Sequence, residues 1–329
     1  MHVDNAPMLA PHPVTKGDKR RKSFYDLKRK FLRDWQLHLM ILIPVAYLLI
    51  FNYGPMYGIQ IAFKDYRTRD GIWGSEFVGL KWFEKFFNYY RVGDIIWNTI
   101  SLSLYSIVAG FPIPVFLALL LNTVEHKRFK KTVQTVSYMP HFISVTIMVG
   151  ILNMVFSPVN GLYGNLFRLF GGSGFPEDIR ATEAAFPHLY TWSGIWASVG
   201  WSTIIYTAAL SAVSPELHEA AQLDGASRWK RVLNVDLPTI MPTVAINLIL
   251  RMGDILSVGF EKVYMMQTAL NINASEVIST YVYSAGMGSP RDYSYGTAVG
   301  LFNSLVSLGL VLLTNWICKV LTDREVSIF

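Results

Sequence analysis

The sequence predicts an all-α polytopic membrane protein with six transmembrane helices. Of its 329 residues, 52% are hydrophobic and only 16% are charged, whereas about 25% of an ordinary soluble domain is charged. Six segments each come close to the roughly 20 mostly apolar residues that cross about 30 Å of hydrocarbon. Repeated segments of this length exclude a typical soluble enzyme. The six segments are residues 37–63, 96–121, 133–156, 189–213, 244–260 and 297–320.

Basic residues predict the orientation of these spans. Eighteen of the 29 lysines and arginines lie in the N-terminal tail, between spans two and three, between spans four and five, and at the C-terminus. Basic residues that flank spans stay in the cytoplasm, so we expect a multi-pass protein of a bacterial inner membrane with both termini cytoplasmic. A basic run beside a span indicates contact with membrane lipid rather than nucleic acid.

The chain divides accordingly along its length. We expect a basic cytoplasmic tail over residues 1–36, a retained first transmembrane helix over 37–63, and an extracytoplasmic segment over 64–95. A core of five transmembrane helices follows over residues 96–321, and a short cytoplasmic tail over 322–329 ends the chain. The first apolar run exceeds the 7 to 15 residues of a signal peptide, and no small-x-small cleavage site closes it.

Two extracytoplasmic loops differ in composition. Residues 64–95 interleave aromatic and charged residues, which is typical of an interfacial helix anchored at the headgroups. Residues 157–188 are richer in glycine and proline, which predicts turns around a short helix.

The cytoplasmic segment 214–242 carries the most specific pattern. Ser214, Pro215 and Glu216 form a helix start, with serine as the cap and proline at the first helical position. We expect this helix to stop near Gly225 and, after a turn, a second helix to end at Pro238. Such helices are too short and polar to cross lipid, so they should lie along the membrane face.

The motif in this segment resembles that of a known family. Glu219-Ala220-Ala221, three residues, Gly225, nine residues and Val235-x-Leu237-Pro238 match the EAA loop of permease subunits of bacterial ABC importers, with Val235 where isoleucine is usual. Over residues 36–329 the sequence resembles carbohydrate-importer permeases, the group that includes the maltose-importer subunits. Three further motifs, at 138–144, 259–262 and 276–283, resemble the oligosaccharide and polysaccharide branch. The sequence is most similar there to a membrane subunit of an alginate importer, although no motif identifies the substrate.

The resemblance implies a mechanical role for the EAA loop. In this family its first helix docks in a cleft of the ATPase and moves as a rigid piece when nucleotide closes the ATPase pair. The carboxylate of Glu219 can reach a basic group on a partner, the alanines allow close helix approach, and glycine permits the turn. The residues expected to couple are Glu219, Ala220, Ala221, Asp224, Gly225, Leu237 and Pro238.

The sequence predicts no catalytic residue, cofactor or metal site in this chain. A Gly-x-x-x-x-Gly-Lys-Ser/Thr phosphate loop is missing, so ATP and Mg²⁺ should be used by a separate ATPase. The seven histidines are scattered, and no two share one helical face as metal ligands would.

Polar residues inside the spans are the candidates for a translocation path. A charge at mid-membrane costs about 2.5 to 3.5 kcal/mol or more, so it normally faces protein or water. Arg251 and Asp254 lie three apart on one helical face and can pair, either as a gate or cavity wall or as a structural ion pair. Amides and tryptophan also serve as helix contacts. The weaker candidates are Asn247, Asn153, Trp201 and Asn303.

Six helices are too few to surround a pore for a sugar chain, so we expect a second permease subunit. The resemblance favours a related but different chain, together with two ATPase subunits and an extracytoplasmic solute-binding protein. The alternative is a self-contained secondary transporter or channel for a polar solute, which would need no ATPase.

Overall fold

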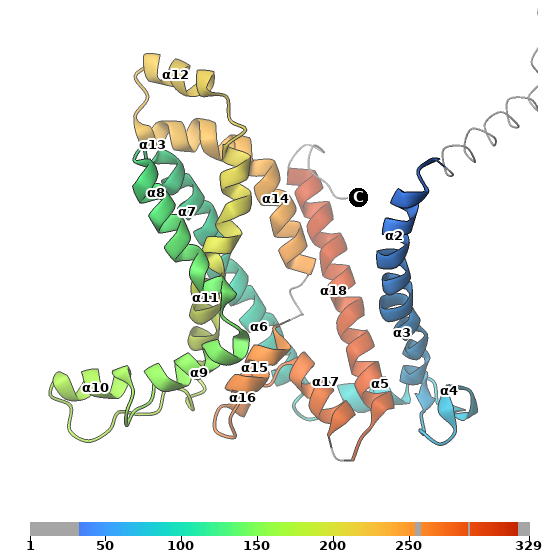
Figure 1. Cartoon of the computed structure of the whole chain (residues 1–329). Helices are drawn as coiled ribbons and strands as arrows, with labels where there is room; N and C mark the ends of the chain where they lie inside the picture. The colour runs from blue at the N-terminus through green and yellow to red at the C-terminus, as the bar shows by residue number, and fades with distance from the viewer. Residues whose placement is uncertain (1–32, 254–257, 289, 322–329) are drawn as a thin grey trace, which may run out of the picture. The chain divides into compact units, whose positions relative to one another are not determined.

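The computed structural model describes residues 33–253, 258–288 and 290–321, and these are almost entirely helical (Figure 1). The chain forms two compact units, residues 1–59 and 60–329. The all-α prediction is wrong in one detail, because the two-residue strands β1 (Lys64–Asp65) and β2 (Glu76–Phe77) pair antiparallel. A single turn of helix, α4 (Gly71–Gly74), lies between them.

In the first unit, one helical stretch carries the predicted first span. It consists of α2 (Trp35–Leu48), the π-turn η1 (Leu49–Tyr53) and α3 (Gly54–Met56), and a 3-10 turn η2 (Tyr57–Phe63) continues from it. The whole stretch is long and apolar enough to cross a membrane, and none of the α2 residues is buried. A helix that is apolar on all sides is expected either to be buried or to lie in lipid.

In the second unit, three more helices are long and apolar enough to cross a membrane. The first joins α6 (Val92–Gly110) and α7 (Pro112–Thr123), and the last lies within α18 (Tyr293–Leu321). The predicted fourth span corresponds to α11 (Phe186–Leu210), a helix of 25 residues. Serines, threonines, tyrosines and glycines lie among its apolar residues, and it is not one of the four helices of the described residues that are long and apolar enough to cross a membrane.

The third predicted span, 133–156, is not one straight helix. Helix α8 (Lys127–Tyr138) leads through a 3-10 turn η3 (Met139–Phe142) into α9 (Val145–Val155), and the two parts are bent by 100°. Pro140 is buried at the break and cannot donate a backbone hydrogen bond. The hydroxyl of Ser144 then caps a new helix by accepting from the Ile147 N–H at 3.3 Å.

The predicted bounds of the fifth span and of the loop before it are wrong. The second helix of segment 214–242 does not end at Pro238. It begins with α13 (Arg228–Arg231), continues through the π-turn η4 (Val232–Asp236), and becomes α14 (Leu237–Gly253). A π-turn shifts the hydrogen bonds from i+4 to i+5, which lets the chain pass a proline, a residue with no N–H, without ending the helix.

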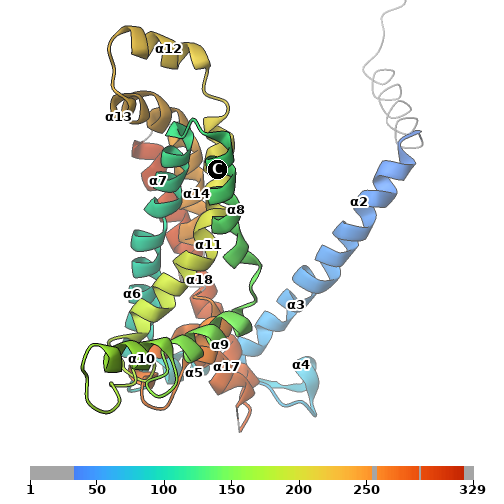
Figure 2. The ribbon, with the colours of Figure 1, turned by 60° about the vertical axis from the view of Figure 1, so that its left-hand side comes forward.

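Helix α11 is the centre of the second unit, packed against α6, α7, α8 and α14 (Figures 1 and 2). Gly200 allows its closest approach, because a Cβ there would lie 2.1 Å from the Ser137 carbonyl oxygen of α8. Two buried clusters lie toward opposite ends of the unit. One gathers α7, α11 and α14 side chains (Val115, Ala118, Leu119, Tyr206, Leu210, Val213, Val232 and Ile240), and the other is built on α5, α17 and α18 (Ala62, Trp82, Phe86, Ile95, Ile278, Tyr281, Tyr295, Ala298 and Val299).

The segments outside the long helices are short helices. Helix α5 (Lys81–Phe87) buries Trp82 and Phe86, so only part of the predicted aromatic anchor at 64–95 is free to contact headgroups. The loop 157–188 does hold one short helix, α10 (Leu162–Leu169), as predicted. Between α14 and α18 lie α15 (Phe260–Met266), α16 (Ile272–Ser275) and α17 (Ile278–Met287).

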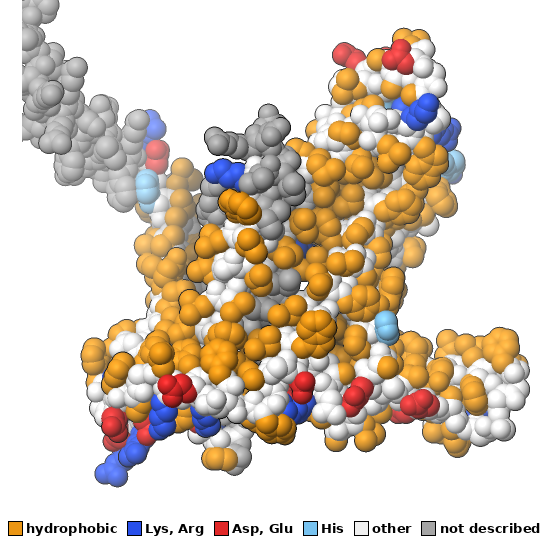
Figure 3. Space-filling model, turned by 180° about the vertical axis from the view of Figure 1, so that it is seen from behind, with side chains coloured by type: hydrophobic (Ala, Val, Ile, Leu, Met, Phe, Trp, Pro, Cys, Tyr) orange, Lys and Arg blue, Asp and Glu red, His pale blue; other side chains and the backbone are white. Residues whose placement is uncertain are grey.

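The surface of the second unit separates by side-chain type. In Figure 3 hydrophobic side chains cover its middle, and charged side chains gather along the edge near α5 and at the α12 end. Large apolar residues of the long helices are exposed in this belt, which a soluble monomer of this size would rarely show. They include Ile100, Leu104, Val108, Phe116, Leu250, Leu305, Leu308 and Leu312.

Candidate functional site

The predicted coupling motif forms a helix, a turn and a second helix. Helix α12 (Pro215–Leu223) begins where the Ser214 hydroxyl accepts a hydrogen bond from the Glu216 N–H at 3.3 Å. It ends with Gly225 at φ +74°, and the Ala226 N–H donates to the Ala221 carbonyl at 2.9 Å. This is a glycine-dependent helix C-cap, so the helix stop predicted near Gly225 is confirmed.

The seven predicted coupling residues divide between α12 with its turn and the start of α14. Glu219, Ala220, Asp224 and Gly225 are exposed, and Ala221 is half-buried. The remaining two, Leu237 and Pro238, open α14, where Leu237 packs against the α7–α11–α14 cluster. The free surface of the motif is therefore that of α12 and its turn, which project at one end of the unit (Figure 2).

A charged cavity of about 460 Å³ lies beneath α12. His218 from α12 and Asp236 from the π-turn meet across it, with His218 Nε2 at 3.1 Å from Asp236 Oδ1. The same carboxylate oxygen accepts a hydrogen bond from the amide of Asn122 on α7 at 3.3 Å. Sequence analysis missed both His218 and Asp236, because their partnership depends on the π-turn.

Three of the predicted pathway residues meet at a second cavity. Arg251, Asn247 and Trp201 line a space of about 250 Å³ between α11, α14 and the α6–α7 junction. The guanidinium of Arg251 donates to the Ser202 hydroxyl at 3.5 Å. The Asn247 amide donates within its own helix, to the Thr243 carbonyl at 2.8 Å. On the wall of the cavity, the His141 ring stacks on Trp201 with centroids 4.5 Å apart.

A third cavity, of about 230 Å³, adds a second cation that sequence analysis missed. Arg251 lines it together with Lys262 of α15 and polar residues of α6 and α11. The Lys262 ammonium donates to the Tyr190 carbonyl at 2.6 Å and lies 4.6 Å from the centroid of the Tyr190 ring. Burial lowers the pKa of Lys262 to about 8. Among the described residues that line these two cavities there is no Asp or Glu.

The other predicted pathway residues are not brought to these cavities. Asn153 lies near the end of α9, where its backbone carbonyl accepts from Arg180 at 3.0 Å. Asn303 lies on α18, and its buried Oδ1 has no hydrogen-bond partner among the described residues. Asp254 lies outside the described residues, so the predicted pair with Arg251 is not described.

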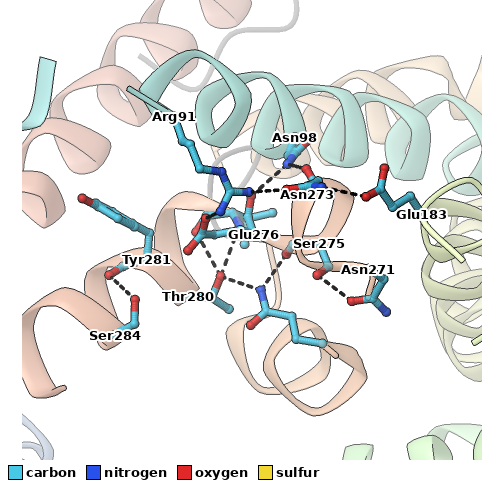
Figure 4. A network of polar contacts seen from close by, with 12 residues as sticks. Arg91, Asn98, Glu183, Asn271, Asn273, Ser275, Glu276, Thr280, Tyr281 and Ser284 are labelled. Atoms are coloured by element: carbon cyan, nitrogen blue, oxygen red, sulfur yellow. Dashed lines mark hydrogen bonds and ion pairs between the residues drawn. The ribbon is translucent and has the colours of Figure 1, made fainter. Parts of the chain in front are cut away.

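A polar network holds together the end of the unit away from α12 (Figure 4). Arg91, at the start of α6, forms an ion pair with Glu276 at 2.9 Å and donates to the Asn273 side chain at 3.2 Å. Asn98 donates to the backbone carbonyls of Asn273 and Glu276, and Asn273 donates to Glu183 at 2.8 Å. Burial raises the pKa of Glu276, and the nearby Arg91 opposes this. The network joins α6, the segment before α11, and the α16–α17 connection.

Comparison with known proteins identifies the family. The family described as "Binding-protein-dependent transport system inner membrane component" matches residues 94–326, which is most of the chain. The protein belongs to this family. Membership confirms the predicted resemblance and makes the chain a membrane permease component of a binding-protein-dependent transporter.

Individual relatives cover nearly the whole chain. The polygalacturonan/rhamnogalacturonan transport system permease protein YteP of Bacillus subtilis is 42% identical over 93% of this chain and 93% of its own length. Protein LplB of the same organism is 40% identical over 96% of this chain and 98% of its own length. A chain from the crystal structure of a bacterial ABC transporter that imports the acidic polysaccharide alginate superposes with a TM-score of 0.81 at 36% identity, over 90% of this chain and 99% of that one. A chain from the crystal structure of a bacterial alginate ABC transporter in complex with an alginate pentasaccharide-bound periplasmic protein gives a TM-score of 0.82, also at 36% identity, over 91% of this chain and 99% of that one.

Proposed function

We propose that this permease component imports an acidic oligosaccharide or polysaccharide built from uronic acids, of which alginate is one example. The observation that carries the proposal is the pair of cavities between α11, α14 and α15, where Arg251 and Lys262 are the cations among the described lining residues. Charged side chains at such depth are expensive unless they meet an opposite charge or water. A sugar carboxylate that passes through would meet both cations.

The relatives support an acidic sugar as the substrate. One is named for polygalacturonan and rhamnogalacturonan, and the matched structures concern alginate. These polymers share a carboxylate on the sugar ring, which is a ligand that guanidinium and ammonium groups bind well. A cavity lined by hydroxyls, aromatic rings and two cations suits that chemistry.

We infer six spans in the functional protein: the α2 stretch, α6–α7, the bent α8–α9 pair, α11, α13–α14 and α18. Helix α11 is the helix that α6, α7, α8 and α14 surround, so it can span while carrying serines, threonines and tyrosines. The α12 end carries Lys127, Arg128, Lys130, Lys131, Arg228, Lys230 and Arg231. By the positive-inside rule this end and both termini are cytoplasmic.

We infer that α12 docks on a separate ATPase subunit, which binds ATP and Mg²⁺, and that this chain holds no cofactor. The exposed face with Glu219 and Ala220 supports this, because a small side chain there lets a partner approach closely. The complete importer would contain a second, related permease, two ATPase subunits and an extracytoplasmic solute-binding protein. The α2 stretch, long and apolar enough to cross a membrane, would form the first span.

The substrate proposal is tested in proteoliposomes that hold the complete importer. With loaded binding protein at saturation, Arg251→Gln and Lys262→Gln should each slow import of an acidic oligosaccharide about tenfold, the size expected from losing one hydrogen bond to a charged group. Lys131→Gln, at an exposed lysine away from both cavities, is the matched control. Import that is unchanged in both cavity variants would overturn the acidic-substrate proposal.

The ATPase proposal has a separate test. Ala220→Arg places a bulky charge on the exposed face of α12 and should lower the amount of ATPase that copurifies with the permease about tenfold or more. Leu169→Arg makes the same kind of change at an exposed site on α10, at the other end of the unit, and should retain the ATPase. Import by the purified chain alone, driven by an ion gradient, would instead favour a secondary transporter.

A further inference from the structure

Helix α12 is joined to the rest of the second unit by few side-chain interactions. None of its residues is buried, and its two ends are a serine cap and a glycine turn. Among the residues that the structure describes, His218 is the α12 side chain that forms a hydrogen bond or ion pair with another helix. The helix projects at the end of the unit (Figure 1), so a force applied to it reaches the core through few contacts.

Asp236, the partner of His218, is buried, whereas no residue of α12 is. Asp236 is 2% exposed, and a buried carboxylate must have its oxygens satisfied. His218 Nε2 lies 3.1 Å from one oxygen of this carboxylate, and the Asn122 amide donates a hydrogen bond to the same oxygen. Other charged side chains line the same cavity: Glu125 before α8, Glu219 on α12, and Arg228 and Arg231 on α13. Of these, Arg228 is engaged by Glu125 at 2.9 Å.

Asp236 connects the His218 contact to helix α14. It is the last residue of the π-turn η4, directly before α14, and α14 carries Asn247 and Arg251 into the cavity shared with α11. A π-turn is a locally widened stretch of helix, often found at functional sites. His218 of α12 therefore contacts the helix that carries Asn247 and Arg251. The contact is made where the backbone hydrogen bonds of that helix change from the π pattern to the α pattern.

We propose that His218 is a positioning residue that transmits displacement of α12 through Asp236 to α14 and so to Arg251. This inference rests on the proposed docking of the ATPase at α12. The His218–Asp236 contact would hold α12 and the start of α14 together as one rigid piece. Without it, α12 would still carry the ATPase but would move without turning α14.

The test compares variants of the complete importer in proteoliposomes and measures sugar imported per ATP hydrolysed. His218→Ala alone would strand a buried carboxylate, so the main variant is the double change His218→Ala with Asp236→Asn, which removes the charge together with its partner. We expect ATPase copurification to be unchanged and the ratio of import to ATP hydrolysis to fall about tenfold, as for the loss of one hydrogen bond to a charged group. His218→Gln, whose amide N–H can reach the same oxygen, should keep most of the wild-type ratio.

Gln222→Ala is the matched control, because Gln222 lies on the same helix and lines the same cavity. A ratio that stays at the wild-type value in the double variant would overturn the inference, as would an equal fall in Gln222→Ala. A merely structural role would lower import and ATP hydrolysis in proportion and leave the ratio unchanged. Failure of the wild-type permease to retain any ATPase would overturn the docking proposal instead, which a change in ratio would not do.

Discussion

The two ends of the second unit are held in opposite ways. At the α12 end, one side chain of an unburied helix reaches the core, through His218 and Asp236. At the other end, the Glu276 network ties α6, the segment before α11 and the α16–α17 connection with several hydrogen bonds and an ion pair (Figure 4). In the proposed transmission through His218, the α12 end is the part that moves and the other end is the base that stays fixed.

The largest expected effect is at the fixed end. Arg91→Ala leaves the carboxylate of Glu276, 14% exposed, without its cation, and we expect the free energy of unfolding to fall by about 3 kcal/mol. The thermal midpoint of the purified permease measures this. Arg67→Ala removes an arginine that is 71% exposed in a pair with Asp65 and should shift the midpoint little. An equal shift in both variants would mean that the buried Arg91–Glu276 pair stabilises this end no more than an exposed ion pair does.

The second prediction concerns the cavity between the ends. Because the pKa of Lys262 is about 8, its ammonium is charged below that pH and loses its charge as the pH rises through 8. One unit above, at pH 9, about one lysine in ten remains charged, so import of an acidic oligosaccharide should fall. The Lys262→Arg variant stays charged and should lose this fall in the pH profile. The same decline in both forms would assign it to another group.

A smaller effect is expected at the turn after α12. Gly225 has φ +74° with open space around it, so Gly225→Ala costs only backbone strain, about 1 kcal/mol. We expect a several-fold loss of ATPase copurification, because the strain changes the direction of α12. Gly171→Ala introduces the same strain at φ +88°, also in open space, after α10. ATPase retention that falls equally in both would argue against a special role for the α12 turn.

The smallest effect is expected for an exposed ion pair at the α12 end. Arg228 and Glu125 form an ion pair at the α12 end whose side chains are 66% and 80% exposed. Exposed pairs contribute about 0 to 1 kcal/mol, so Glu125→Ala should leave the thermal midpoint nearly unchanged. A shift as large as that of Arg91→Ala would mean that the α12 end is held as firmly as the base.

Much of the coupling motif could be predicted from sequence, because its signals are local. Serine, proline and glycine at fixed spacing specify the start and stop of α12 without help from the rest of the chain. The apolar runs likewise predicted helical segments, and among the described residues four helices, or five with the bent pair, are long and apolar enough to span. By contrast, the 100° bend between Phe142 and Val145 depends on tertiary packing, since a span with a proline such as Pro140 can also be a nearly straight helix.

The candidate site was predicted less completely, for a similar reason. Arg251, Asn247 and Trp201 stand out as polar or amphipathic residues in apolar runs, and they do meet at one cavity. Lys262 lies after the run in sequence, and only its packing against Tyr190 of α11 makes it a buried cation. The continuation of the helix past Pro238 was missed because a π-turn has no composition signal. Asn153 and Asn303 gave the same signal as Asn247 but lie elsewhere.

The π-turn at Val232–Asp236 has one more consequence, for the rotational phase of α14. A π-turn is equivalent to one residue inserted in an α-helix, and each residue turns a helix by about 100°. Because the widened turn takes up that extra residue, the residues after it keep about the same rotational phase as in an uninterrupted helix. Deleting one residue in the π-turn should therefore restore a regular helix and leave Asn247 and Arg251 facing α11, whereas deleting one residue early in α14 would turn both side chains by about 100°. The π-turn is thus the place in this helix where a change of length disturbs the cationic cavity least.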